Sequence, residues 1–95
     1  MDLSKYGVND EIMKNISKKI KNLDKVKTIK LNHNKLTETG IKYLLKSLKT
    51  LNVEFLFMTH NYLDETCIDY LISFKKYNKK LKAVYITNNP LSKKG

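Results

Sequence analysis

Val26-Lys27-Thr28-Ile29-Lys30-Leu31-Asn32-His33-Asn34-Lys35-Leu36 is a stretch whose apolar positions, arranged around one asparagine, recur twice further along the chain. The shared pattern is apolar-x-x-apolar-x-apolar-x-x-Asn-x-apolar. The asparagines lie 27 and then 28 residues apart, and a fixed period of this length indicates stacked structural units. The three copies are Val26, Ile29, Leu31, Asn34 and Leu36; Val53, Leu56, Met58, Asn61 and Leu63; and Leu81, Val84, Ile86, Asn89 and Leu91.

This pattern resembles a leucine-rich repeat. Its period and the continuation Leu36-Thr37-Glu38-Thr39-Gly40-Ile41-Lys42-Tyr43-Leu44-Leu45 are similar to the ribonuclease-inhibitor-like subfamily, over about residues 23 to 95. The resemblance implies an α/β fold: a short right-handed solenoid with a parallel β-sheet on its concave face and helices on its convex face. The activities that the subfamily implies are binding ones, such as enzyme inhibition, cytoskeletal capping, GTPase regulation and scaffolding.

The 95 residues are expected to form a single domain, because a chain of this length has little room for a second core. We assign residues 1–25 to an N-terminal helical cap, 26–52 to the first repeat, 53–80 to the second and 81–95 to a partial third. Residues 1–8 contain no recognisable strand. The helical period that starts at Asn9 or Asp10 and runs to about Asn22 predicts an amphipathic helix, which would cover the first repeat.

The repeat also predicts where the other elements lie. Thr37 and Asp64 are expected to cap two helices, the first ending near Lys49. Ile68, Leu71 and Ile72 are expected to face the core from the second of these helices. Alternating apolar residues predict short strands at 27–32, 55–59 and 83–87.

The three repeat asparagines are expected to be structural. A short amide both donates and accepts hydrogen bonds, so Asn34, Asn61 and Asn89 can satisfy backbone groups where the chain turns off the sheet. The third repeat has no helix of its own in the sequence, so Val84, Ile86 and Leu91 are expected to form an open C-terminal edge. We expect self-association or a permanent partner at this edge.

Outward residues at equal repeat positions should form columns on the concave face, and we predict that these columns bind a protein partner. Phe55, Phe57 and Tyr85 stand out, because packing within the sheet does not require aromatic residues there and clustered aromatics are typical of interface centres. The alternative is that the rings cover the sheet or pack against the terminal segments. The predicted columns are Thr28, Phe55 and Ala83; Lys30, Phe57 and Tyr85; and Asn32, Thr59 and Thr87.

No catalytic, cofactor or metal site is expected. His33 and His60 share one repeat position, but two imidazoles are too few ligands for zinc. Cys67 takes the place of Gly40 in the next repeat and is expected to pack in the core rather than act as a nucleophile. The single cysteine favours an intracellular, reducing compartment, the cytoplasm before an organelle. No apolar stretch is long enough to span a membrane.

The net charge of +10 supports a second interpretation: a small basic structural subunit of a larger complex, such as a ribonucleoprotein. All 19 basic residues are lysine, although arginine is preferred for bidentate contacts to phosphates and bases. Lysine, asparagine and isoleucine make up 37 of the 95 residues, a bias that an AT-rich genome would also impose. Nucleic acid is therefore a less favoured partner than protein.

Overall fold

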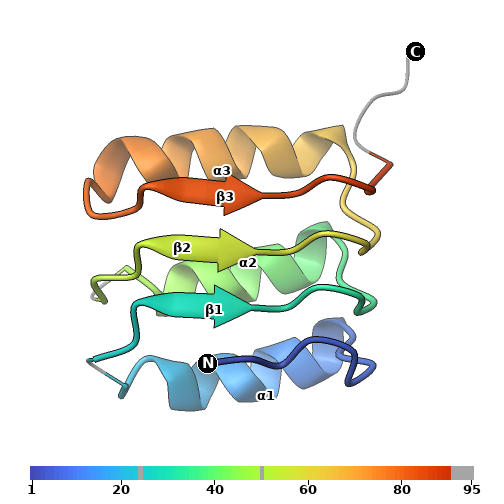
Figure 1. The fold of residues 1–95 in the computed structure, drawn as a ribbon, viewed down its shortest axis with the longest axis horizontal. Helices are drawn as coiled ribbons and strands as arrows, with labels where there is room; N and C mark the ends of the chain where they lie inside the picture. Colours follow the sequence, from blue (N-terminus) through green and yellow to red (C-terminus); the bar gives the residue numbers. More distant parts are fainter. Residues whose placement is uncertain (24, 50, 91–95) are drawn as a thin grey trace.

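The structure is a computed structural model that describes residues 1–23, 25–49 and 51–90. Three helices and three strands alternate along the chain (Figure 1). The predicted α/β class is confirmed, although the strands are shorter than expected and the second helix ends at Ser47. The elements are α1 (Asp10–Ile20), β1 (Thr28–Lys30), α2 (Glu38–Ser47), β2 (Phe55–Phe57), α3 (Glu65–Tyr77) and β3 (Ala83–Tyr85).

The strands form a parallel sheet in the order β1-β2-β3. The central residue of each strand pairs with the next, so that Ile29 lies beside Leu56 and Leu56 beside Val84. All three helices lie on one side of this sheet (Figure 1). Among the described residues, no helix covers the other side of the sheet.

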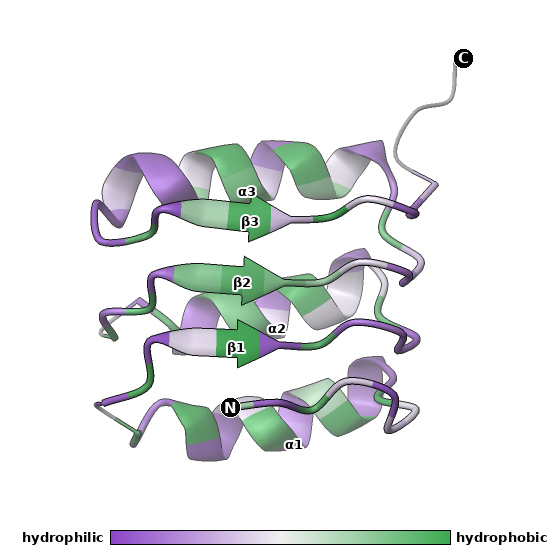
Figure 2. Cartoon of the chain, viewed as in Figure 1, coloured by the Kyte–Doolittle hydropathy of each residue, from purple (hydrophilic) through white to green (hydrophobic). Residues whose placement is uncertain are grey.

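The core fills the space between the sheet and the helices. Ile29 and Leu56 from the strands, Leu44 from α2 and Leu48, the residue that caps the end of α2, have no exposed surface. Figure 2 shows hydrophobic and hydrophilic residues alternating along the helices, whereas β2 is hydrophobic throughout. Burying one apolar side chain of this size stabilises the fold by about 1.5 to 3 kcal/mol, so the repeat positions supply the main stabilising contacts.

Each repeat asparagine joins two successive turns, and Asn61 shows how. Its side-chain carbonyl accepts a hydrogen bond from the backbone N–H of Leu36 at 3.0 Å. Its amide donates to the backbone carbonyls of Leu31 at 2.9 Å and Met58 at 3.1 Å. Asn61 is only 4% exposed, so these backbone groups have little access to water.

The same arrangement occurs before and after this turn. The side-chain carbonyl of Asn89 accepts from the N–H groups of Asn61 and Leu63. The side-chain carbonyl of Asn34 likewise accepts hydrogen bonds from the N–H groups of Tyr6 and Val8. The amide contacts thus repeat across the sheet, from the N-terminal segment to the turn after β3.

The N-terminal segment is more ordered than the sequence predicts. Asp2 forms a parallel bridge with Lys30, and the N–H of Leu3 donates to the Lys30 carbonyl at 2.8 Å. Lys5 has φ of 67°, and the corresponding turn residue His33 has φ of 58°. Residues 1–5 therefore extend the pairing beyond β1, which corrects the expectation that this region adds only a helix.

The structure confirms the predicted caps Thr37 and Asp64, and it assigns the start of the first helix, which the sequence placed at Asn9 or Asp10, to a cap at Asn9. The side chain of Asn9 accepts from the N–H of Ile12, that of Thr37 from Thr39 and that of Asp64 from Thr66. Such caps satisfy donors that have no partner within the helix. The sequence signals for helix initiation were thus reliable in all three helices.

One apolar residue of α3 lies outside the core. Ile72 was expected to face inward, but it is 62% exposed. Leu71 and Phe74, by contrast, are buried. The prediction for Ile72 was wrong because its side of α3 has no neighbouring helix within the described residues, whereas α2 lies between α1 and α3 (Figure 1).

Candidate partner-binding face

The helix-free side of the sheet carries a column with one residue from each strand. The parallel register places Lys30 beside Phe57 and Phe57 beside Tyr85. The two rings stack with centroids 4.5 Å apart and planes 6° apart. Lys30 Nζ lies 5.6 Å from the centroid of the Phe57 ring, within the range of a cation–π contact. We call Lys30, Phe57 and Tyr85 the aromatic column.

The aromatic column is accessible. Tyr85 is 44% exposed, and Phe57 is half-buried. Neighbouring Ile29 and Leu56 point to the helices and are fully buried, because successive residues of a strand face opposite sides. The two rings therefore contribute contact area that the helix-facing core does not use.

The flanking columns are mixed in character. Phe55 lies between Thr28 and Ala83 in the register and is half-buried. On the other flank, the side-chain carbonyl of Asn32 accepts from both the N–H and the hydroxyl of Thr59, at 2.8 and 2.9 Å. The side-chain carbonyl of Asn32 is thus already engaged within the chain. Thr87 continues this flank and is exposed.

Sequence reasoning missed one member of this face, Asp2. It lies beside Lys30, and its carboxylate accepts from the N–H of Ser4 at 3.0 Å, which lowers the pKa of Asp2 below its usual value. A signal was present, because Leu3 precedes Leu31 by one repeat period. On this face, Asp2 thus adds a carboxylate next to the Lys30 end of the aromatic column.

The two histidines lie at the end of this face. His33 and His60 stack with ring centroids 4.1 Å apart, and both have positive φ. Desolvation of His33, together with the nearby His60 and Lys5, lowers its pKa below 6.5. Within residues 1–23, 25–49 and 51–90, no group of three or more His, Cys, Asp or Glu side chains is placed to hold a metal ion.

Cys67 lies inside the fold. The side chain is fully buried, and burial raises the pKa of its thiol. A buried thiol with a raised pKa is a poor nucleophile, because the thiolate is the reactive form. The geometry thus favours packing as the role of Cys67.

The C-terminal edge exposes apolar surface. Val84 and Ile86 are half-buried and, with the outer side of α3, line a hollow of about 280 Å³. Ile72 and Ile68 contribute from the helix. Leu91, the third residue expected here, lies outside the described residues.

No protein-family model matches the chain, and no curated protein matches it. In the part of the chain that the structure describes, no helix is long and apolar enough to cross a bilayer.

Proposed function

We propose that the chain is a short leucine-rich-repeat solenoid that acts as a non-catalytic protein–protein interaction module. The solenoid assignment is supported by three strand-and-turn units in constant register and by the repeat asparagines that join their turns. In a solenoid of this kind, the helix-free side of the sheet is the concave face. The resemblance to the ribonuclease-inhibitor-like subfamily implies binding rather than catalysis.

The observation that carries the functional proposal is the accessible ring stack. Phe57 and Tyr85 present stacked rings on the side of the sheet that the helices leave uncovered. Aromatic residues are enriched at interface centres because they bury a large area with little loss of side-chain freedom. Lys30 at one end of the stack would pair with an acidic group of the partner.

Affinity capture from the producing cells tests the proposal. We expect Phe57→Ala and Tyr85→Ala each to reduce recovery of the specifically captured protein about tenfold or more, since interface hot spots cost about 2 kcal/mol or more on truncation. The matched control is Tyr6→Ala, which removes a ring that is 74% exposed and outside the column. Equal recovery with all three variants, at unchanged circular dichroism, would reject the aromatic column as the binding site.

A second candidate function is that of a basic structural subunit, such as one within a ribonucleoprotein complex. The supporting observation is that lysines such as Lys18, Lys19 and Lys46 lie exposed on the helices, away from the aromatic column. This candidate predicts RNA binding that weakens steeply with added salt. RNA binding that does not weaken with added salt, or the absence of RNA binding, would argue against this candidate function.

A further inference from the structure

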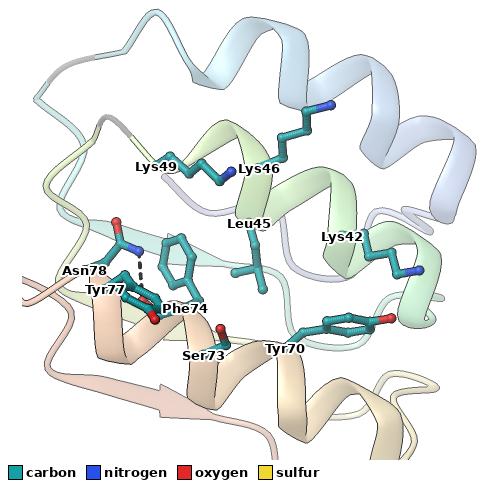
Figure 3. Close-up of a pocket in the computed structure, with 9 residues that line it drawn as sticks. All are labelled: Lys42, Leu45, Lys46, Lys49, Tyr70, Ser73, Phe74, Tyr77 and Asn78. Carbon is teal, nitrogen blue, oxygen red and sulfur yellow. Dashed lines mark hydrogen bonds between the residues drawn. The ribbon is translucent and has the colours of Figure 1, made fainter.

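A groove lies between α2 and α3 on the helix side of the molecule (Figure 3). Its volume of about 410 Å³ is within the range of ligand-binding clefts. Leu45 and Phe74 form the floor and are 7% and 9% exposed. Tyr70 and Tyr77 flank the floor from α3 (Figure 3). We call this cleft the α2–α3 groove.

Lysines line the opposite rim. Lys42 and Lys46 of α2, and Lys49 just after it, line the groove. The Lys46 side chain is directed toward α1 (Figure 3). Lys42 pairs with Glu38 at 3.4 Å and lies 5.0 Å from the centroid of the Tyr70 ring, so its charge is already engaged. Within the described residues, Lys46 and Lys49 have no ion-pair partner.

The positive charge continues beyond the groove. A second hollow of about 220 Å³ shares Phe74, Tyr77 and Lys49 with the groove and adds Lys79 and Lys80. Neither hollow has a carboxylate among its lining residues in the described chain. The helix C-termini contribute only about half a negative charge each, which the lysines outweigh.

We propose that the α2–α3 groove binds an acidic segment of a partner protein. An aromatic or aliphatic side chain of that segment would occupy the floor on Leu45 and Phe74, beside the ring of Tyr77. Its carboxylates would face Lys49 and, at the α1 side of the rim, the exposed Lys46. The groove is separate from the aromatic column, so this inference does not depend on the function proposed for that column.

The chemistry of the floor favours a peptide over a nucleic acid. A nucleobase has polar edges, and the floor residues Leu45 and Phe74 offer no side-chain donor or acceptor for them. The nearby Asn78 amide already donates to the Phe74 carbonyl at 2.8 Å. Burying a polar edge without a hydrogen-bond partner is unfavourable, and an apolar side chain avoids that cost.

Fluorescence anisotropy with a short fluorescein-labelled peptide tests the proposal. The probe carries leucine, phenylalanine and glutamate in amphipathic helical order. We expect saturable binding to the full chain. We expect Tyr77→Ala and the double variant Lys46→Glu/Lys49→Glu each to weaken binding about tenfold or more, since each removes a contact that the groove makes with the peptide. A tenfold loss of affinity corresponds to about 1.4 kcal/mol of binding free energy. Both sites are exposed, and circular dichroism verifies that the variants fold.

Two controls distinguish binding in the α2–α3 groove from non-specific attraction to the net positive charge of the chain. The variant Lys19→Glu/Lys25→Glu makes the same change in net charge at exposed positions outside the groove, and we expect a loss of about twofold or less, as is typical of charges remote from an interface at moderate salt. A probe with alanine in place of leucine and phenylalanine should bind at least about tenfold more weakly.

Four results would overturn the proposal. They are no saturable binding of the probe, equal losses in the two double-charge variants, equal binding of the alanine probe, and preferential binding of a labelled oligouridine with the same sensitivity to Tyr77→Ala and Lys46→Glu/Lys49→Glu. The last result would assign the groove to RNA.

Discussion

At the scale of single residues, one asparagine amide connects two neighbouring units. The Asn61 side chain bonds the backbone of Leu36 and Leu31 in the preceding unit and that of Met58 in its own. Leucine at this position would be similar in size but could neither donate nor accept. The backbone groups would remain buried and unpaired.

We therefore predict that Asn61→Leu lowers the free energy of unfolding by about 1 to 3 kcal/mol, the usual cost of stranding a buried polar group. Urea denaturation measures this directly. Asn15→Leu is the matched control: Asn15 is exposed on α1, and a surface change of this kind is expected to stay within about 0.5 kcal/mol. Equal stability of the two variants would contradict the structural role of Asn61.

The asparagine positions could be predicted from sequence because each repeats with its apolar neighbours. Asp2 could not be assigned so readily, since Leu3 and Val8 match only part of the pattern and Tyr6 replaces the asparagine. The backbone of residues 1–5 still pairs with the β1 region as β1 pairs with β2. The partial repeat at residues 1–8 is recognised only once the pairing of residues 1–5 with the β1 region is known.

At the scale of elements, α1 and α2 are joined at their N-terminal ends by a carboxylate. Asp10 accepts from the N–H groups of Thr37 and Gly40, at 2.9 and 3.0 Å, and from the Thr37 hydroxyl. Negative charge is favourable at a helix N-terminus. A side chain at Gly40 would collide with this carboxylate and crowd Leu36. Asp10 therefore explains why the position is a glycine.

This contact predicts coupling between two substitutions. Asp10→Ala should cost about 1 to 2 kcal/mol, similar to the loss of a helix cap. Gly40→Ala should also destabilise the native chain, although alanine is favoured over glycine in helices by about 1 kcal/mol. In the Asp10→Ala background the carboxylate is gone, so Gly40→Ala should cost less or become stabilising.

A double-mutant cycle from urea denaturation measures the coupling. We expect a coupling energy of about 0.5 kcal/mol or more, as for residues in direct contact. Strictly additive effects would show that Asp10 and Gly40 do not interact as the structure describes.

Element positions were predictable because capping residues and apolar periods are local signals. Burial on α3 was harder to predict. The apolar period of a helix identifies its hydrophobic side but does not show whether a neighbouring element covers that side. Ile72 belongs to that apolar side, yet lies beside the open hollow with Val84 and Ile86. The sequence likewise did not distinguish the lysines of the α2–α3 groove from lysines on any other solvent-exposed surface.

At the scale of the whole molecule, the apolar C-terminal edge predicts self-association. Val84, Ile86 and Ile72 line one hollow, and covering it with a second copy would remove apolar surface from water. Sedimentation velocity at micromolar concentration should therefore show a reversible dimer or larger species. A well-folded monomer throughout that range would contradict self-association.

Ile72→Lys provides the mutational test of the same edge. A charged side chain in the hollow should weaken association about tenfold or more, since burying one isoleucine contributes about 1.5 to 3 kcal/mol. Ser73→Lys is the control, because it adds the same charge at the next, exposed residue on the groove side of α3. Equal association of both variants would exclude Ile72 from the contact.

Site-specific photocrosslinking in the producing cells determines whether the aromatic column binds a protein partner. Tyr85 is replaced with photoreactive p-benzoylphenylalanine, and Tyr6, an exposed residue outside the column, is replaced in a control. We expect a discrete adduct with another protein from position 85 that is absent from position 6 and is lost on adding Phe57→Ala. Identical adducts from both positions, or none from position 85, would contradict this expectation.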